Sequence, residues 1–374
     1  MKSDTASQPT PFELRKEVRQ LCADWQQAGR YTPRSDSWLR SPDPEFSKEL
    51  AARGLIGLTW PAPYGKGLSN VHRLAVTEEL LRAGAPVASH WIADRQIGPT
   101  VLRHGNPRLQ AEILPGIASA DLAFCLGLSE PEAGSDLASA RTRALPDGDG
   151  FRISGRKIWT SGAHHATHAY VLARTTPRTE RDRPHRGLSE FVVDMTADGV
   201  GVSPIVDMTG EHHFNEVTFD DVRVSAHRLI GTEGEGWRQV TEQLAFERGG
   251  PERVLTTYPL LLAILRDASP LSSTLAPELG RFAAQLGVLR RLCHMIAEML
   301  DAGAAPVQEA ATCKLLGNAF ERDVLELARR VVPHGPPSLR QSLDQALLAS
   351  PGFSLRGGAS EVLLSIVTKN EVAS

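Results

Sequence analysis

The chain has 374 residues, and its 41% hydrophobic and 23% charged content is that of a globular protein with a sizeable core. Its formal net charge of −3 argues against a DNA or RNA binder with a basic groove. The chain has four cysteines and no Cys-x-x-Cys pair, which argues against a disulfide scaffold and a common zinc site. It has no apolar run long enough to span a bilayer and no signal-peptide core, which predicts a cytoplasmic protein.

Residues 1–120 have the residue spacing of helices. Apolar positions recur at three- and four-residue intervals, and Pro and Gly stand at the joins. This pattern predicts an N-terminal helical domain with helices over 46–52, 71–83 and 109–117.

Residues 121–230 have a different sequence pattern, in which short runs of β-branched or apolar residues alternate with clusters of turn residues such as 146–150. They predict a small antiparallel β domain with strands over 122–128, 151–155, 169–173, 190–193, 200–205 and 216–219.

Residues 231–374 return to long amphipathic patterns, which predict helices over 237–248, 254–267, 277–300 and 307–330. Helices of this length pack as a bundle. The predicted fold class is therefore α+β, with an N-terminal helical domain, a central small antiparallel β domain and a C-terminal domain like a four-helix bundle.

Two short segments of the β region carry groups that could bind a ligand. Segment 126–136 (LGLSEPEAGSD) follows an apolar strand, and its turn offers backbone N–H groups and the hydroxyls of Ser129 and Ser135 to a phosphate or a polar heterocycle. Segment 155–162 (GRKIWTSG) carries Trp159 followed by two hydroxyl residues, which suits a planar ring. The alternatives are an ordinary loop and a core tryptophan.

In this order the two segments resemble the acyl-CoA dehydrogenase family, FAD enzymes that oxidise acyl-CoA thioesters to enoyl-CoA. The stretches 213–224 and 229–237 resemble that family's exit from its β domain, 313–317 resembles a late helix, and 357–361 (GGASE) resembles its C-terminal turn. The resemblance covers nearly the whole chain and implies an oxidoreductase with the fold predicted above.

The resemblance also implies a role for each matched position. It implies a FAD site formed by Leu126, Leu128, Ser129, Gly134, Ser135, Trp159, Ser161 and Glu361. Trp159 would lie against the isoalloxazine ring, and the Ser161 hydroxyl would donate a hydrogen bond to flavin N5, where the hydride arrives. The implied substrate-binding residues are Ser135, Arg248 and Gly358.

The reaction also needs a carboxylate that removes the α-proton of the thioester. Many family members supply a glutamate just before the C-terminal turn, but Gly357 occupies that position here. A second family solution places the glutamate on the first long helix of the bundle, which points to Glu247. Independently, Glu247 continues an apolar helix face with Trp237 and Leu244. An ion pair with a neighbouring arginine, or a solvated helix end before Gly249-Gly250-Pro251, is the alternative.

The sequence departs from the family at the positions that bind FAD across a subunit interface. Residues 339–352 lack the Gln-x-x-Gly-Gly-x-Gly-Tyr motif, and Arg281-Phe282 only faintly resembles Arg-x-x-Phe-Gly. Three explanations stay open: a homo-oligomer with other contacts, an α2β2 assembly with a paralogue, or a specialised member with altered chemistry.

The remaining expectations concern partners and competing functions. An acyl-CoA or acyl-carrier thioester is the expected substrate, and an electron-transfer flavoprotein is the expected oxidant. The competing functions are a flavoenzyme or oxidase of this fold with a carrier-bound or non-CoA substrate, and a non-catalytic subunit that supports an active paralogue. The histidines at 164–168 and 212–213 lack a complete ligand set, so no metal is expected.

Overall fold

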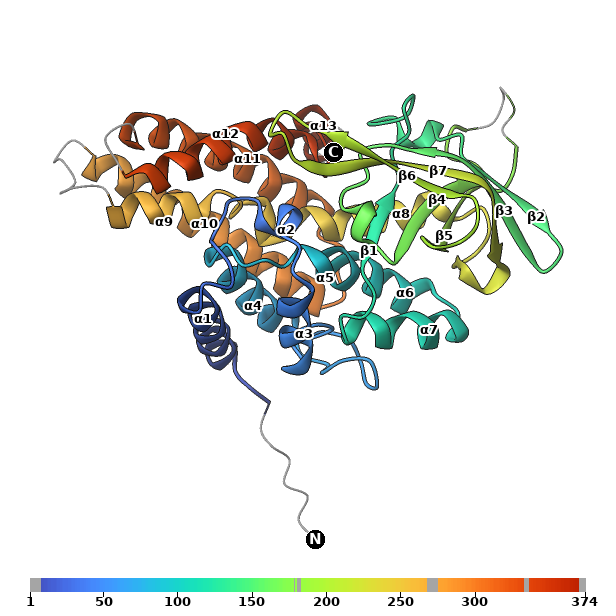
Figure 1. Ribbon diagram of the computed structural model, residues 1–374, viewed down its shortest axis with the longest axis horizontal. Coiled ribbons are helices and arrows are strands. Elements are labelled where there is room, and N and C mark those ends of the chain that lie inside the picture. The colour runs from blue at the N-terminus through green and yellow to red at the C-terminus, as the bar shows by residue number, and fades with distance from the viewer. Residues whose placement is uncertain (1–7, 178, 180–182, 268–274, 333–335, 370–374) are drawn as a thin grey trace, which may run out of the picture.

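The structure is a computed structural model that describes residues 8–177, 179, 183–267, 275–332 and 336–369, with the backbone only at 245–247. Three parts follow one another along the chain, as Figure 1 shows: helices, a twisted sheet and a second set of helices. The predicted α+β fold class is therefore confirmed, while the predicted domain boundaries stay predictions. In the described part of the chain, no helix combines the length and apolarity that a membrane crossing requires.

The N-terminal helices are α1 (Pro11–Gln27), α2 (Ser37–Arg40), α3 (Pro44–Ala52), α4 (Asn70–Arg82), α5 (Ala88–Ile92), α6 (Gly98–His104) and α7 (Pro107–Ala118), with a π-helical turn η1 (Ala93–Ile97) between α5 and α6. The three predicted helices correspond to α3, α4 and α7. The sequence analysis placed no helix over α1, although Thr10 and Glu13 form a capping box at its start. Its buried face joins a large core centred on residues such as Val18, Trp91 and Ile113.

The sheet contains β1 (Phe124–Gly127), β2 (Arg143–Asp147), β3 (Gly150–Lys157), β4 (His168–Arg174), β5 (Leu188–Asp194), β6 (Val200–Val206), β7 (His212–Ser225) and β8 (Leu229–Ile230). Its order is β6-β7-β3-β2-β4-β5-β8, and β1 pairs with β4. Most pairs are antiparallel, as predicted, but β1 and β2 each pair with β4 in parallel. The purely antiparallel expectation was wrong there because β1 and β4 are not joined by a hairpin, and the chain builds β2 and β3 between them.

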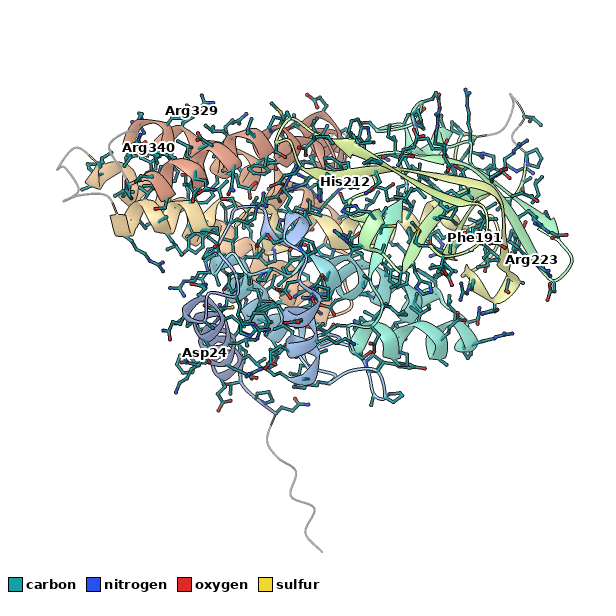
Figure 2. All side chains as sticks on the ribbon, viewed as in Figure 1. Asp24, Phe191, His212, Arg223, Arg329 and Arg340 are labelled. Carbon is teal, nitrogen blue, oxygen red and sulfur yellow. The ribbon has the colours of Figure 1, made fainter. Side chains whose placement is uncertain are left out.

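The C-terminal part contains α8 (Gly236–Arg248), a 3₁₀ turn η5 (Pro251–Arg253), α9 (Tyr258–Asp267), α10 (Ala276–Asp301), α11 (Val307–Val331), α12 (Pro337–Leu355) and α13 (Ser360–Lys369). The predicted helix over 254–267 begins later, at Tyr258, because the chain first closes the η5 turn. Helices α12 and α13 were not among the predicted elements. In Figure 2, Arg329 and Arg340 lie at the end of this bundle that is remote from the sheet. Arg223 marks the sheet, at the opposite side of the molecule.

Candidate functional site

The structure brings together the two segments that the sequence singled out, which we call the motif loops (126–136 and 155–162). The backbone N–H of Ile158 donates to the carbonyl of Ser129 over 2.9 Å. Leu126 lies in β1, and Leu128 and Ser129 follow it, all three half-buried. The end of β1 and the end of β3 therefore form one continuous surface.

A buried ion pair fixes the two motif loops to each other. Lys157 is fully buried, and its Nζ lies 2.8 Å from Oε1 of Glu130 and 3.0 Å from the carbonyl oxygen of Leu128. Glu130 also accepts from the backbone N–H groups of Arg141 and Thr142 over 2.6 and 2.9 Å. Neither residue was predicted to have a role, and the available signal was a lysine at the end of β3 directly before the apolar pair Ile158-Trp159.

The charges of this pair are consistent with its hydrogen bonds. Burial alone would raise the pKa of Glu130, but Lys157 and the two backbone donors outweigh it and hold this pKa below its usual value. Burial lowers the pKa of Lys157, and Glu130 opposes that shift. The pair is therefore ionised in the interior, where its four polar contacts replace water.

Trp159 stands at the tip of the second motif loop. Its φ of +59° is unusual for a bulky residue, its side chain is 56% exposed, and its ring meets Phe214 edge-on at 5.7 Å. The alternative of a core tryptophan is therefore wrong. The next residue is held by Asn215: the backbones of Thr160 and Asn215 exchange two hydrogen bonds of 3.0 Å.

The surroundings of Trp159 fit a planar polar ligand such as a flavin. Gly134 and Ser135 of the first motif loop are exposed, and a Cβ added at Gly134 would meet no atom within 4 Å, so this loop borders open space. Ser161 is half-buried beside them. The Thr160 hydroxyl is buried and has no hydrogen-bond partner among the described residues. The motif loops thus present an exposed aromatic ring and an open turn to solvent, and they contain a buried hydroxyl without a partner among the described residues.

A second group of predicted residues meets at the end of α8. The Nε of Arg248 donates to the carbonyl of Gly357 over 2.9 Å, and a Cβ added at Gly358 would lie 3.5 Å from the Arg248 guanidinium. Both glycines have positive φ, 68° and 112°, which favours glycine in this turn. The backbone of Glu247 precedes Arg248 in the last turn of α8, but its side chain lies outside the described residues. Glu361 is exposed in the first turn of α13.

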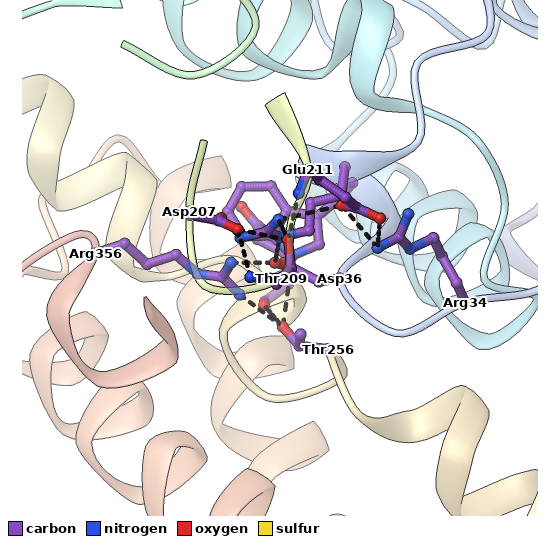
Figure 3. A network of polar contacts seen from close by, with 10 residues as sticks. Arg34, Asp36, Asp207, Thr209, Glu211, Thr256 and Arg356 are labelled. Atoms are coloured by element: carbon purple, nitrogen blue, oxygen red, sulfur yellow. Dashed lines mark hydrogen bonds and ion pairs between the residues drawn. The ribbon is translucent and has the colours of Figure 1, made fainter. Parts of the chain in front are cut away.

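An interdomain network, drawn in Figure 3, connects the Gly357 turn to the sheet. Arg356 donates to Asp36 over 2.6 Å and to Thr256 over 3.2 Å. Arg40 donates to the same Asp36 over 3.3 Å and to Asp207, in the β6–β7 turn, over 2.5 Å. The remaining contacts of Arg40 and Arg34 are to Thr209 and Glu211.

This network extends to the aromatic side chains of the site, because the Arg40 guanidinium also lies 5.9 Å from the ring of Phe214, the neighbour of Trp159. The two groups of site residues are therefore linked through one chain of contacts. No residue of this network was assigned a role from sequence, since its members come from four distant stretches of the chain.

A cavity begins directly behind the end of α8. It is lined by Gly249 and Gly250, by α4 and η1 on one side and by α10 on the other, and it is a partly open cavity with a volume of about 40 Å³. We call it the α4 cavity. Its position next to Arg248 suits the part of a substrate that extends beyond the reacting carbons.

The histidines near the motif loops pack against one another. The rings of His164 and His212 stack with centroids 3.9 Å apart, and Asn215 bonds to both, over 3.1 and 2.7 Å. Within the described ranges, no three His, Cys, Asp or Glu side chains gather as metal ligands would. The expectation of no metal stays a prediction.

Comparison with known proteins identifies the family. Acyl-CoA dehydrogenase N-terminal, middle and C-terminal domain families match residues 11–121, 125–222 and 272–371. Acyl-CoA dehydrogenase IpdE1 of Mycobacterium tuberculosis is 35% identical over 337 residues, covering 87% of this chain and 86% of the relative.

Two solved structures agree with this assignment. The "Tcur3481-Tcur3483 steroid ACAD" matches with a TM-score of 0.82 at 27% identity, over 98% of both chains. The ChsE4-ChsE5 complex from Mycobacterium tuberculosis matches with a TM-score of 0.82 at 28% identity, over 99% of both chains. The resemblance inferred from the motifs is confirmed: the chain belongs to the acyl-CoA dehydrogenase family, whose members are flavoprotein oxidoreductases with FAD as cofactor, and is an acyl-CoA dehydrogenase.

Proposed function

We propose that this chain introduces a double bond between Cα and Cβ of an acyl-CoA thioester, with Glu247 as the base that removes the α-proton. The contact between Arg248 and Gly357 carries the proposal. It joins the two places where this family supplies its base, and of these Gly357 has no side chain and Glu247 has a carboxyl group. In the sequence Glu247 follows the apolar run Leu244-Ala245-Phe246, and a dry surrounding would raise the basicity of its carboxylate.

The residues around the motif loops would hold FAD, which supplies the acceptor for the hydrogen that leaves Cβ. The exposed Trp159 ring offers a stacking face, and the hydroxyls of Thr160 and Ser161 offer hydrogen bonds to a polar ring edge. We keep Leu126, Leu128, Ser129, Gly134, Ser135 and Glu361 as the further cofactor contacts. Arg248 and Gly358, together with Ser135, would orient the thioester so that its α-proton faces Glu247.

The acyl group is proposed to be a bulky, ring-containing acid. The α4 cavity lies beyond the glycines that follow α8, where the far end of such a group would extend. The name of one solved relative, a steroid ACAD, points in the same direction.

A partner subunit is the favoured explanation for the missing cross-subunit motif. The complex of ChsE4 and ChsE5 contains two differently named proteins, and Trp159 exposes much of its ring in the single chain. We therefore propose an α2β2 assembly with a paralogue, with a homo-oligomer as the alternative and an electron-transfer flavoprotein as the oxidant. A cytoplasmic location stays a prediction.

The experiment is anaerobic addition of a panel of acyl-CoA thioesters to the flavin-loaded enzyme, alone and co-expressed with its paralogue, while the flavin absorbance is followed. We expect one thioester to bleach the flavin, and Glu247→Gln to slow that bleaching by at least about a thousandfold, because proton abstraction is lost. Glu235→Gln is the matched control, since Glu235 lies exposed before the same helix and pairs with Arg238. Full activity of an assembly carrying Glu247→Gln would instead identify this chain as the non-catalytic subunit.

A further inference from the structure

One arginine of the α4 cavity has no side-chain partner in the part of the chain that the structure describes. Arg73 belongs to the first turn of α4 and lines the cavity together with Arg95 and Glu252. Among the described residues, no carboxylate oxygen lies within 4.0 Å of the Arg73 guanidinium, and no hydrogen bond from it is found. The guanidinium therefore faces the cavity with its five N–H donors unused by the described protein groups.

The neighbouring charges are already engaged. Arg95 has its Nε 3.0 Å from Asp94, and its guanidinium lies 4.7 Å from the Trp91 ring centroid. The other carboxylate oxygen of Asp94 accepts from the backbone N–H of Gly57 over 2.8 Å. Arg95 also lines the cavity, but its guanidinium contacts Asp94 and the Trp91 ring, whereas the Arg73 guanidinium has no such contact among the described residues.

Asp301 and Glu252 are the two remaining carboxylates near Arg73. Asp301 accepts from the backbone and the side chain of Asn70 over 2.6 and 2.7 Å, at the start of α4. Glu252 packs over Gly250, where an added Cβ would lie 2.1 Å from its Oε2. Both acids act on Arg73 only from a distance.

Keeping an unpaired cation at this place is unfavourable for the protein alone. Burial, followed by the charge of Arg95, lowers the pKa of Arg73 to about 10, so the group stays charged near neutral pH while losing hydration. The N-terminal turn of a helix also disfavours a positive charge. A ligand oxygen at the guanidinium would relieve both penalties.

The rest of the cavity wall is suited to hydrocarbon. Leu74 of α4 and Ile296, Ala297 and Leu300 of α10 line it beside the charged groups, and Gly249 and Gly250 line it next to the end of α8. A ligand that enters past Arg248 would therefore place carbon against α10 and could place an oxygen atom at Arg73.

We propose that Arg73 is a specificity-determining residue that binds an oxygen atom on the far end of the acyl group. The substrate class is an acyl-CoA whose ring-containing acyl group carries a keto or carboxylate oxygen remote from the thioester. This inference rests on the proposed function and deepens it, because it says which acyl groups the α4 cavity selects.

The test uses three thioesters of equal carbon skeleton: decahydronaphthalene-propanoyl-CoA, its ring ketone and its ring carboxylic acid. Calorimetry measures their affinities for the holoenzyme, and anaerobic bleaching measures flavin reduction. We expect an oxygenated thioester to bind about 10- to 100-fold more tightly than the plain one, the range for a hydrogen bond to a charged group. If the ring ketone gains more affinity than the ring carboxylic acid, the oxygen at Arg73 belongs to a ketone; if the acid gains more, it belongs to a carboxylate.

The variants assign that preference to Arg73. Arg73→Met should reduce the affinity ratio to about one, and Arg73→Lys should retain part of it, because lysine keeps the charge but not the planar fork. Arg82→Met is the matched control, since Arg82 is an exposed arginine at the other end of α4 that contacts Glu79 at 3.5 Å. It should leave the ratio unchanged.

The two readouts separate this inference from the proposed function. Equal affinities for the three thioesters, or a preference that survives in Arg73→Met, would overturn the subsite even where the flavin is reduced. A preference that disappears in Arg73→Met would support the subsite even where no thioester reduces the flavin, a result that would contradict only the proposed dehydrogenation.

Discussion

The two motif loops and the end of α8 are built in different ways. The motif loops come from neighbouring stretches of the chain, and the buried pair of Lys157 and Glu130 locks them together inside one sheet. The end of α8 meets the Gly357 turn, about a hundred residues later, through one side-chain-to-backbone hydrogen bond and the interdomain network. The first region is therefore fixed by local pairing and a desolvated charge pair, and the second by partly exposed polar contacts between distant elements.

If this contrast is correct, a substitution that breaks the buried ion pair of the motif loops should cause the largest loss of stability. Lys157→Met leaves the Glu130 carboxylate buried without its counter-ion, and we expect the free energy of unfolding to fall by about 3–5 kcal/mol. Urea unfolding followed by far-UV circular dichroism measures it. A loss below about 1 kcal/mol would show that the loops do not depend on the pair.

The junction between the sheet and α8 should respond to pH. Glu190 in β5 is buried and accepts from Gln239 of α8 over 2.8 Å, and burial raises the pKa of Glu190 to about 8, from 4.5. The protonated Glu190 contributes its full stability below pH 4.5. Between pH 4.5 and pH 8 the unfolded chain releases this proton while the folded protein keeps it, so the contribution to stability declines and is lost as the pH rises through 8.

We therefore expect Glu190→Gln to gain roughly 2–5 kcal/mol relative to the wild type between pH 5 and pH 8. Thermal unfolding of both proteins across this range measures the difference. Parallel curves for the two proteins would contradict the raised pKa.

The interdomain network should be weaker than the buried pair. Arg356→Met removes the 2.6 Å bond to Asp36, and Arg40 remains as the partner of that carboxylate. We expect a loss of about 1–3 kcal/mol in the free energy of unfolding. Because Arg356 precedes the Gly357 turn, the acyl-CoA concentration needed for half-maximal activity should also rise.

Arg340→Met is the control for this variant, since Arg340 is an exposed arginine on α12, the helix that ends just before Arg356 (Figure 2). If both variants raise the half-maximal acyl-CoA concentration equally, the effect belongs to the helix surface and not to the network.

The smallest effect should come from an exposed pair of the sheet. Arg223 contacts Asp149 at 2.8 Å, but the two side chains are 61% and 86% exposed. Solvent screens such a pair, so Arg223→Ala should lower the free energy of unfolding less than any of the variants above. Comparing this value with that of Lys157→Met by the same urea titration measures how much burial adds to an ion pair in one sheet.

Local sequence patterns predicted helices and strands well where hydrophobic periodicity and turn residues indicated the same element. The helices over 46–52 and 71–83 and the strands around 169–173 and 190–193 follow from periodicity and turn chemistry, and the structure contains them. The parallel pairing of β1 with β4 did not follow, because strand direction in a sheet depends on connections longer than a periodicity window. Helix α1 was missed although its capping box stands in the sequence.

By itself the sequence determined the family, the order of helices, sheet and bundle, and the two motif loops, because these depend on neighbouring residues. Tertiary structure alone decided which distant side chains meet. Arg248 reaches Gly357, Arg356 reaches Asp36, and Arg73 faces a cavity bounded by α10, although no spacing connects these positions. The physical reason is that side-chain contacts across packed helices depend on how entire elements pack together, whereas turns and helix caps are closed by residues a few positions apart.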